Sequence, residues 1–120
     1  MKFREIVLKS GIKLLMGKDA RSNDELMKKF KGETNIILHT ESPGSPFGVI
    51  DFPRPTKKEI SLSGVTVARY SQDWRENKDN VKVNVFTGKD ISKKKGMKIG
   101  TWHVSKSKTI KVKKRRIKNI

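Results

Sequence analysis

This 120-residue chain contains two histidines, His39 and His103, and histidine is the residue type that most often serves as a general acid or base. A hydrolytic site would pair one of them with an activated serine, and Ser45, after Pro43 and Gly44, has the most suggestive setting. The glycine pattern that exposes a nucleophilic serine on a sharp turn does not surround it. Two distant histidines and scattered carboxylates also lack metal-ligand spacing, and there is no cysteine. We therefore expect no catalytic, metal or cofactor site.

Anion binding is the other chemistry that the side chains offer. The chain holds 29 Lys and Arg against 12 Asp and Glu, a formal net charge of +17. Residues 89–120 contain 13 of the basic side chains and one carboxylate, that of Asp90, whereas residues 1–88 carry a mixed surface of net charge +5. A surplus of this size repels itself and favours a polyanionic partner. Composition alone leaves nucleic acid, an anionic membrane and an acidic protein open.

The candidate binding residues lie at a predicted helix start, beside a loop rich in glycine and proline, in one basic connection and in the C-terminal tail. A helix start offers free amides to an anion, and lysine clusters suit phosphate contacts. A tryptophan among basic neighbours can stack on a base. These residues are Lys18, Arg21, Asn23, His39, Ser45, Lys89, Lys93, Lys94, Lys95, Trp102, Lys113, Lys114, Arg115 and Arg116. The other tryptophan, Trp74, is expected in the core.

Apolar runs predict the strands that position these side chains. Short runs and polar–apolar alternation indicate strands at residues 3–8, 12–16, 35–39, 47–52, 81–86, 99–104 and 109–112. The first two form a hairpin around Ser10-Gly11. Residues 113–120 lack periodicity and are expected to fray as a basic tail. We expect a single compact α+β domain over residues 1–112, with two helices packed on a mostly antiparallel, mixed sheet.

Two capping boxes predict the helices. Ser22 and Glu25 open a short helix over residues 23–31, which Gly32 ends, and Thr56 and Glu59 open a longer helix over residues 57–76. Small residues recur along the longer helix at Gly64, Ala68 and Ser71. Such a stripe lets a helix lie close to a sheet, which is a packing reason for a glycine in a helix interior.

Apolar runs of three residues at most are too short for a transmembrane helix or for the core of a secretory signal. The lack of cysteine fits a reducing compartment. We therefore expect a cytoplasmic protein that does not act at a membrane. The sequence does not indicate an oligomeric state.

The order of several motifs resembles that of the NFACT-R domain family over about residues 3 to 112. Gly17-Lys18-Asp19-Ala20-x-x-Asn23-Asp24-x-Leu26 resembles the opening signature of that family. The family's later motifs match, in order, the residues at 38–40, 43–46, 68–71, 83–87 and 91–100.

The resemblance implies an RNA-binding-type domain, as in ribosome quality-control factors that engage the large ribosomal subunit and tRNA. We expect a stand-alone, archaeal-type member that binds tRNA or rRNA without catalysis, in a ribosome-linked or RNA-modification process. One alternative is an RNA-processing or RNA-modifying enzyme in which His39, Ser45 and Asp51 meet in a cleft. Another is a protein-interaction module on the ribosome.

Overall fold

A computed structural model describes residues 2–120, in which six strands form one sheet in the order β1-β2-β4-β3-β5-β8. Every neighbouring pair of these strands is antiparallel. The strands are β1 (Arg4–Val7), β2 (Lys13–Met16), β3 (Ile36–Thr40), β4 (Gly48–Ile50), β5 (Val81–Thr87) and β8 (Lys108–Val112). A separate pair joins β6 (Ile91–Ser92) to β7 (His103–Val104). The predicted compact α+β class and the N-terminal hairpin are confirmed.

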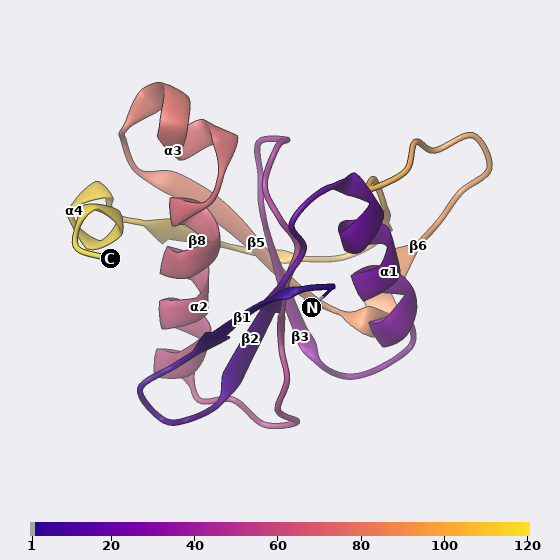
Figure 1. The fold of residues 1–120 in the computed structure, drawn as a ribbon, viewed down its shortest axis with the longest axis horizontal. Helices are drawn as coiled ribbons and strands as arrows, with labels where there is room; N and C mark the ends of the chain where they lie inside the picture. The colour runs from indigo at the N-terminus through magenta and orange to yellow at the C-terminus, as the bar shows by residue number, and fades with distance from the viewer. Residues whose placement is uncertain (1) are drawn as a thin grey trace.

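The two longest helices cover opposite faces of the sheet (Figure 1). Helix α2 (Lys57–Arg69) packs on a core that includes Leu14 and Met16, whereas α1 (Ala20–Phe30) packs on a core that includes Leu15. This division follows from the pleat of β2, which sends successive side chains to opposite faces. The sheet is therefore the middle layer of three.

The contact of α2 with the sheet is as close as its small residues predict. A β-carbon built on Gly64 would lie 2.9 Å from Cδ1 of Ile110. Ala68 is fully buried at the same interface. The packing reason for a glycine inside this helix is confirmed.

The predicted single helix over residues 57–76 is wrong, because the chain turns at Tyr70 and begins α3 (Gln72–Asn77). Ser71 caps the new helix: its Oγ accepts from the Trp74 amide at 3.1 Å and donates to the Ala68 carbonyl at 2.6 Å. A serine hydroxyl competes with the helical backbone for such bonds, which is why serine favours caps over helix interiors. Trp74 is buried, as expected.

The N-terminus of α1 also differs from the prediction. Asp19, not Ser22, is the cap, and its Oδ1 accepts from the Ser22 amide at 2.8 Å. Ser22 returns the bond by accepting from the Asp19 amide at 3.0 Å. Asp19 and Ser22 have the same three-residue spacing as Ser22 and Glu25, and aspartate caps as well as serine. The box at Thr56 and Glu59 is confirmed.

The prediction of a fraying C-terminus is wrong. Residues Lys114–Lys118 form a helix, α4, and Ile117 is completely buried in the core beside α2. One apolar residue among five basic neighbours shows no period, so pattern could not reveal this anchor. The predicted strand at 99–104 is wrong in extent, because only His103 and Val104 pair.

No helix in residues 2–120 combines the length and the apolar character that crossing a bilayer requires.

Candidate functional site

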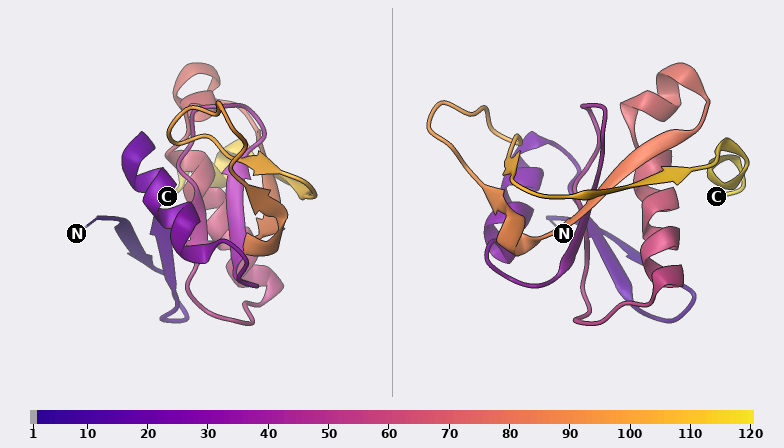
Figure 2. Two further views of the ribbon diagram at one scale, coloured as in Figure 1. Left: turned by 90° about the vertical axis from the view of Figure 1, so that its right-hand side faces the viewer. Right: turned by 180° about the vertical axis from the view of Figure 1, so that it is seen from behind.

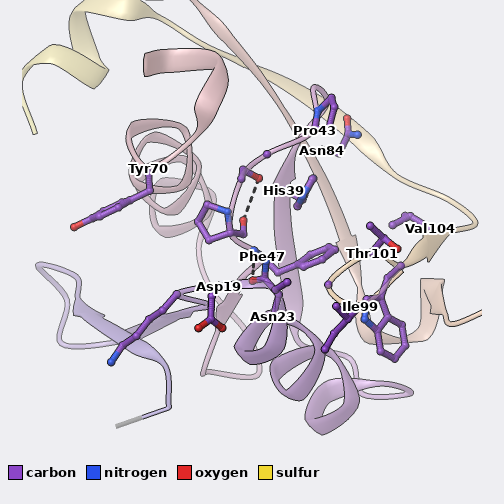
Figure 3. A pocket seen from close by; sticks show the side chains of 18 of the residues that line it. Asp19, Asn23, His39, Pro43, Phe47, Tyr70, Asn84, Ile99, Thr101 and Val104 are labelled. Carbon is purple, nitrogen blue, oxygen red and sulfur yellow. Dashed lines mark hydrogen bonds between the residues drawn. The ribbon is translucent and has the colours of Figure 1, made fainter. Parts of the chain in front are cut away.

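A groove of about 680 Å³ opens at the end of the sheet where β3 stops (Figure 3). Its walls come from segments far apart in the chain. These segments are residues 17–20 at the start of α1, residues 43–47 between β3 and β4, residues 99–102 before β7, and the α2–α3 region with Tyr70 at the junction and Arg75 in α3. The three-layer fold therefore gathers four connections at one end of the sheet.

The groove brings together part of the predicted set. Five predicted residues line it, namely Lys18, Asn23, His39, Ser45 and Trp102. Others lie outside the lining, among them the exposed side chains of Arg21, Lys89, Lys94 and Lys95. The basic residues 113–116 lie at the opposite end of the molecule, at and beside α4 (Figure 2). The predicted residues thus do not form a single site.

Asn23 joins the first helix to the loop after β3. Its Oδ1 accepts from the amide of Phe47 at 3.1 Å. Gly17 makes room for this contact, because a β-carbon there would collide with the Asn23 amide group. Asn23 therefore positions the groove wall and contributes part of its lining.

The side chain of Ser45 is held by the backbone. Its Oγ accepts from the Thr40 amide and donates to the Pro46 carbonyl, both at 3.1 Å, and the residue is 8% exposed. These bonds fix the turn that forms one wall of the groove. A hydroxyl that donates to a carbonyl is not activated by a base, so Ser45 is not arranged as a nucleophile.

His39 lies beside Ser45 with its ring 4.5 Å from that of Phe47. Its Nδ1 donates to the Thr40 carbonyl at 2.7 Å, which places the proton on that nitrogen. Burial lowers the pKa of His39 below its ordinary value, and this effect outweighs the bonds to the backbone of Thr40 and Ser45, which raise it. The imidazole is therefore neutral at pH 7 and adds no positive charge to the groove.

The groove does not contain the third residue of the expected enzymatic cleft. Asp51 follows β4 at the strand end away from Phe47, and its amide donates to the Lys13 carbonyl at 2.9 Å. Residues 2–120 also contain no group of three His, Cys, Asp or Glu side chains that could hold a metal ion. The arrangement of His39, Ser45 and Asp51 in one cleft is therefore wrong.

One buried carboxylate holds the wall formed by residues 99–102. Oδ1 of Asp24 accepts from the Gly100 amide at 2.7 Å, the Trp102 indole at 3.0 Å and the Lys93 ammonium at 3.1 Å. Burial alone would raise the pKa of Asp24, but these bonds outweigh it and hold the pKa below its usual value. The carboxylate is therefore charged at neutral pH and fastens the loop to α1.

This network includes two of the predicted binding residues, Lys93 and Trp102. The Lys93 ammonium also donates to the carbonyls of Lys98 and Thr101, at 2.6 and 2.7 Å. The contacts of Lys93 are thus within the protein. Trp102 is only 9% exposed, which leaves little of its ring for stacking on a base. Asp24 belongs to the matched opening signature, but its partners are 69 to 78 residues away.

Sequence reasoning missed three residues at the rim of the groove. The guanidinium of Arg4 lies 4.6 Å above the ring of Tyr70, and Arg75 donates to the Tyr70 carbonyl at 3.1 Å. Two acidic residues, Asp19 and Glu41, also line the groove. No sequence motif links Arg4, Tyr70 and Arg75, because they come from separate elements. Their proximity is therefore visible only in the folded structure.

These observations define a small, strongly basic α+β domain with a groove at one end of its sheet. Comparison with family models then identifies its family: residues 2–106 match the NFACT protein RNA binding domain, and the chain belongs to that family. Comparison with curated proteins finds no match.

Among solved structures, the chain resembles the C-terminal part of the fibronectin/fibrinogen-binding protein from Streptococcus suis. The TM-score is 0.85 at 23% sequence identity, and the match covers 100% of this chain and 49% of that one. This likeness supports the fold. The chain spans about half the length of that solved chain.

Proposed function

We propose that this protein is a non-catalytic, cytoplasmic RNA-binding protein that contacts tRNA or rRNA in a ribosome-linked or RNA-modification process. The observation that carries the proposal is the groove at the end of the sheet, in a chain of the NFACT RNA-binding family with a net charge of +17.

The groove and the adjacent loop have complementary parts in this function. The groove presents Lys18 and Arg75 to phosphate. The Oδ1 of Asn84 accepts from the Thr109 hydroxyl at 2.9 Å, and its NH2 group suits an acceptor on the edge of a base. The exposed Lys94 and Lys95 lie on the loop that Asp24 fastens beside the groove. These lysines supply contacts to the sugar–phosphate backbone that do not depend on base sequence.

The contacts of the candidate catalytic side chains favour binding over chemistry. The Ser45 hydroxyl and the Nδ1 proton of His39 are both engaged by backbone carbonyls. We expect His39 to support the shape of the groove through its contact with Phe47. RNA incubated with the pure protein should therefore remain chemically unchanged.

The first test is the salt dependence of tRNA binding, measured by fluorescence anisotropy. Neutralising about six phosphates gives a log–log slope of roughly −4 to −5 for a single strand and a steeper slope for a duplex. The groove variant Lys18→Gln/Arg75→Gln should weaken binding and reduce the slope by about 1 to 2. Lys28→Gln/Lys29→Gln is the matched control, since it removes the same charge from the exposed end of α1.

An unchanged slope in the groove variant would contradict the role of the groove, and binding that hardly varies with salt would contradict the proposal. Crosslinking in cells, followed by sequencing of the attached RNA, would then separate tRNA from rRNA. Recovery of neither RNA above background would exclude the ribosome-linked role.

A further inference from the structure

A second, smaller hollow of about 270 Å³ lies between α2, β8 and α4, and it shares no lining residue with the groove. Its floor is apolar and its rim is cationic. The lining residues are Lys57, Ile60, Ser61, Ile110, Lys111, Val112 and Arg116. Three of them are basic and none is acidic, whereas the groove is lined by both signs of charge.

The rim of this hollow is held in place by the fold. Ile117 anchors α4 in the core, and the Lys114 amide donates to Oδ1 of Asn80 at 2.9 Å. The guanidinium of Arg116 donates to Oγ of Ser61 at 2.8 Å, which sets it beside the hollow. A guanidinium has five N–H donors, so this bond leaves donors for an anion.

Within residues 2–120, no ion pair joins a basic side chain at this end of the molecule to a carboxylate. The ion pairs found in residues 2–120 join Lys2 to Glu25, Lys13 to Glu5 and Lys93 to Asp24, all away from α4. Around the hollow, the side chains at 57, 111, 113–116 and 118 are basic and exposed. We call this set, with the hollow, the α4 face.

An RNA backbone matches the chemistry of the α4 face. Lysine and arginine at the rim suit phosphates, and the apolar floor of Ile60 and Ile110 suits the carbon atoms of a ribose. The molecule measures 39 Å along its longest axis, and α4 lies toward the end of it opposite the loop at residues 93–102, part of which lines the groove (Figure 1). A folded RNA can reach both surfaces, whereas a short oligonucleotide in the groove cannot.

We propose that the α4 face is a second RNA-backbone binding surface, separate from the groove, which binds another segment of the same RNA. The proposal extends the proposed function, since it takes the ligand to be RNA. Of the elements that form this surface, α2 lies within residues 2–106, where the family model matches, whereas β8 and α4 lie beyond them.

The test removes the three cations of the hollow in the variant Lys57→Gln/Lys111→Gln/Arg116→Gln. The matched control is Lys28→Gln/Lys29→Gln/Lys31→Gln, three exposed lysines at and just beyond the end of α1. Each protein is titrated with tRNA and with a six-nucleotide single strand over a range of salt. The hollow variant should bind tRNA roughly 50-fold more weakly at 0.15 M salt and lose about 2 from the salt slope. Its affinity for the hexamer should stay within about twofold of the parent.

A hollow variant that binds tRNA like the control would overturn the proposal. Equal losses for tRNA and hexamer would also overturn it, because they indicate one continuous site. Failure of the proposed function looks different: the unmodified protein would not bind tRNA at all. The double variant Lys57→Gln/Lys111→Gln retains the bond between Arg116 and Ser61. It should show about two thirds of the slope change and, by circular dichroism, the melting curve of the parent.

Discussion

Two lysine-rich segments, residues 93–102 and 113–118, lie toward opposite ends of the molecule (Figure 2). In the first, the ammonium of Lys93 turns inward and shares Oδ1 of the buried Asp24 with an indole and an amide. In the second, a buried aliphatic residue, Ile117, anchors the backbone while the basic side chains stay exposed. Lys93 thus serves internal cohesion in the first segment, whereas the basic side chains of the second segment all contribute surface charge.

The difference shows that a count of cations does not measure binding capacity. A lysine beside a buried carboxylate holds the fold together, and its removal leaves an unpaired buried charge. Replacing an exposed lysine on a helix that is anchored by an apolar residue changes the free energy of unfolding little. Its replacement should therefore affect ligand binding more than stability. Stability and RNA affinity should therefore respond to different residues at the two ends.

The largest effect should follow from Asp24→Ala. This change leaves the Lys93 ammonium, the Trp102 indole and the Gly100 amide without their shared acceptor. We expect a loss of about 3 kcal/mol in the free energy of unfolding, measured with urea. Asp24→Asn, which retains an acceptor oxygen, should lose less. A loss below about 1 kcal/mol for Asp24→Ala would show that the loop is held by other contacts.

The next effect should come from the anchor at the other end. Ile117→Ala removes a completely buried side chain and should cost about 2 to 3 kcal/mol in urea unfolding. Ile120→Ala is the control, because Ile120 is 57% exposed and should change stability by less than about 0.5 kcal/mol. Equal effects in the two variants would mean that α4 is not anchored through Ile117.

Lys93 and Lys94, which are adjacent in the chain, allow the effects on stability and on RNA binding to be compared directly. Lys93→Gln should lower stability by about 1 to 2 kcal/mol, since it breaks a partly buried ion pair, and should change the RNA salt slope little. Lys94→Gln should leave stability unchanged and reduce the slope by about 0.7 to 0.9. Urea unfolding and anisotropy titrations on the same preparations check both. If Lys93→Gln instead reduced the salt slope and left stability unchanged, Lys93 would be in contact with RNA.

The smallest effect concerns pH. Because burial lowers the pKa of His39 below 6.5, the unfolded chain binds more protons than the folded one as pH falls below 6.5. The free energy of unfolding should therefore decrease between pH 6.5 and pH 5. The lowered pKa values of Asp19, Asp24 and Glu59 keep these groups charged in this interval.

His39→Gln should flatten this part of the stability curve, as thermal unfolding at several pH values would reveal. Asp24→Asn is the control, since it should leave this part of the curve unchanged in slope. A slope that persists in His39→Gln would assign the effect to another group.

Much of the architecture follows from local pattern. Alternation in residues 81–86 and the short apolar runs predicted the strands, and the small residues around Gly64 predicted a helix close to the sheet. The errors arose where two local solutions compete. At the start of α1, Asp19 and Ser22 are equally good caps. After α2, the apolar spacing continues, but Ser71 caps a new helix, α3, and the chain turns there.

The candidate site was predicted less completely. Asn23, His39 and Ser45 do line the groove, whereas Asp51 lies elsewhere, because it follows β4 at the other end of the sheet. The roles of Asp24 and Arg4 had no local signal. Their partners are distant in sequence, and antiparallel pairing with helix packing brings them together.

By itself, the sequence determined the strongly basic character, the α+β class and the motif order of the NFACT RNA-binding family. These properties depend on composition and local periodicity, which are present in the chain before it folds. Only the tertiary structure decided which cations face inward and which remain at the surface. That choice depends on burial. A buried carboxylate such as Asp24 needs hydrogen-bond donors, which here include the Lys93 ammonium. A buried isoleucine such as Ile117 anchors the backbone of α4, so the basic residues next to it stay at the surface.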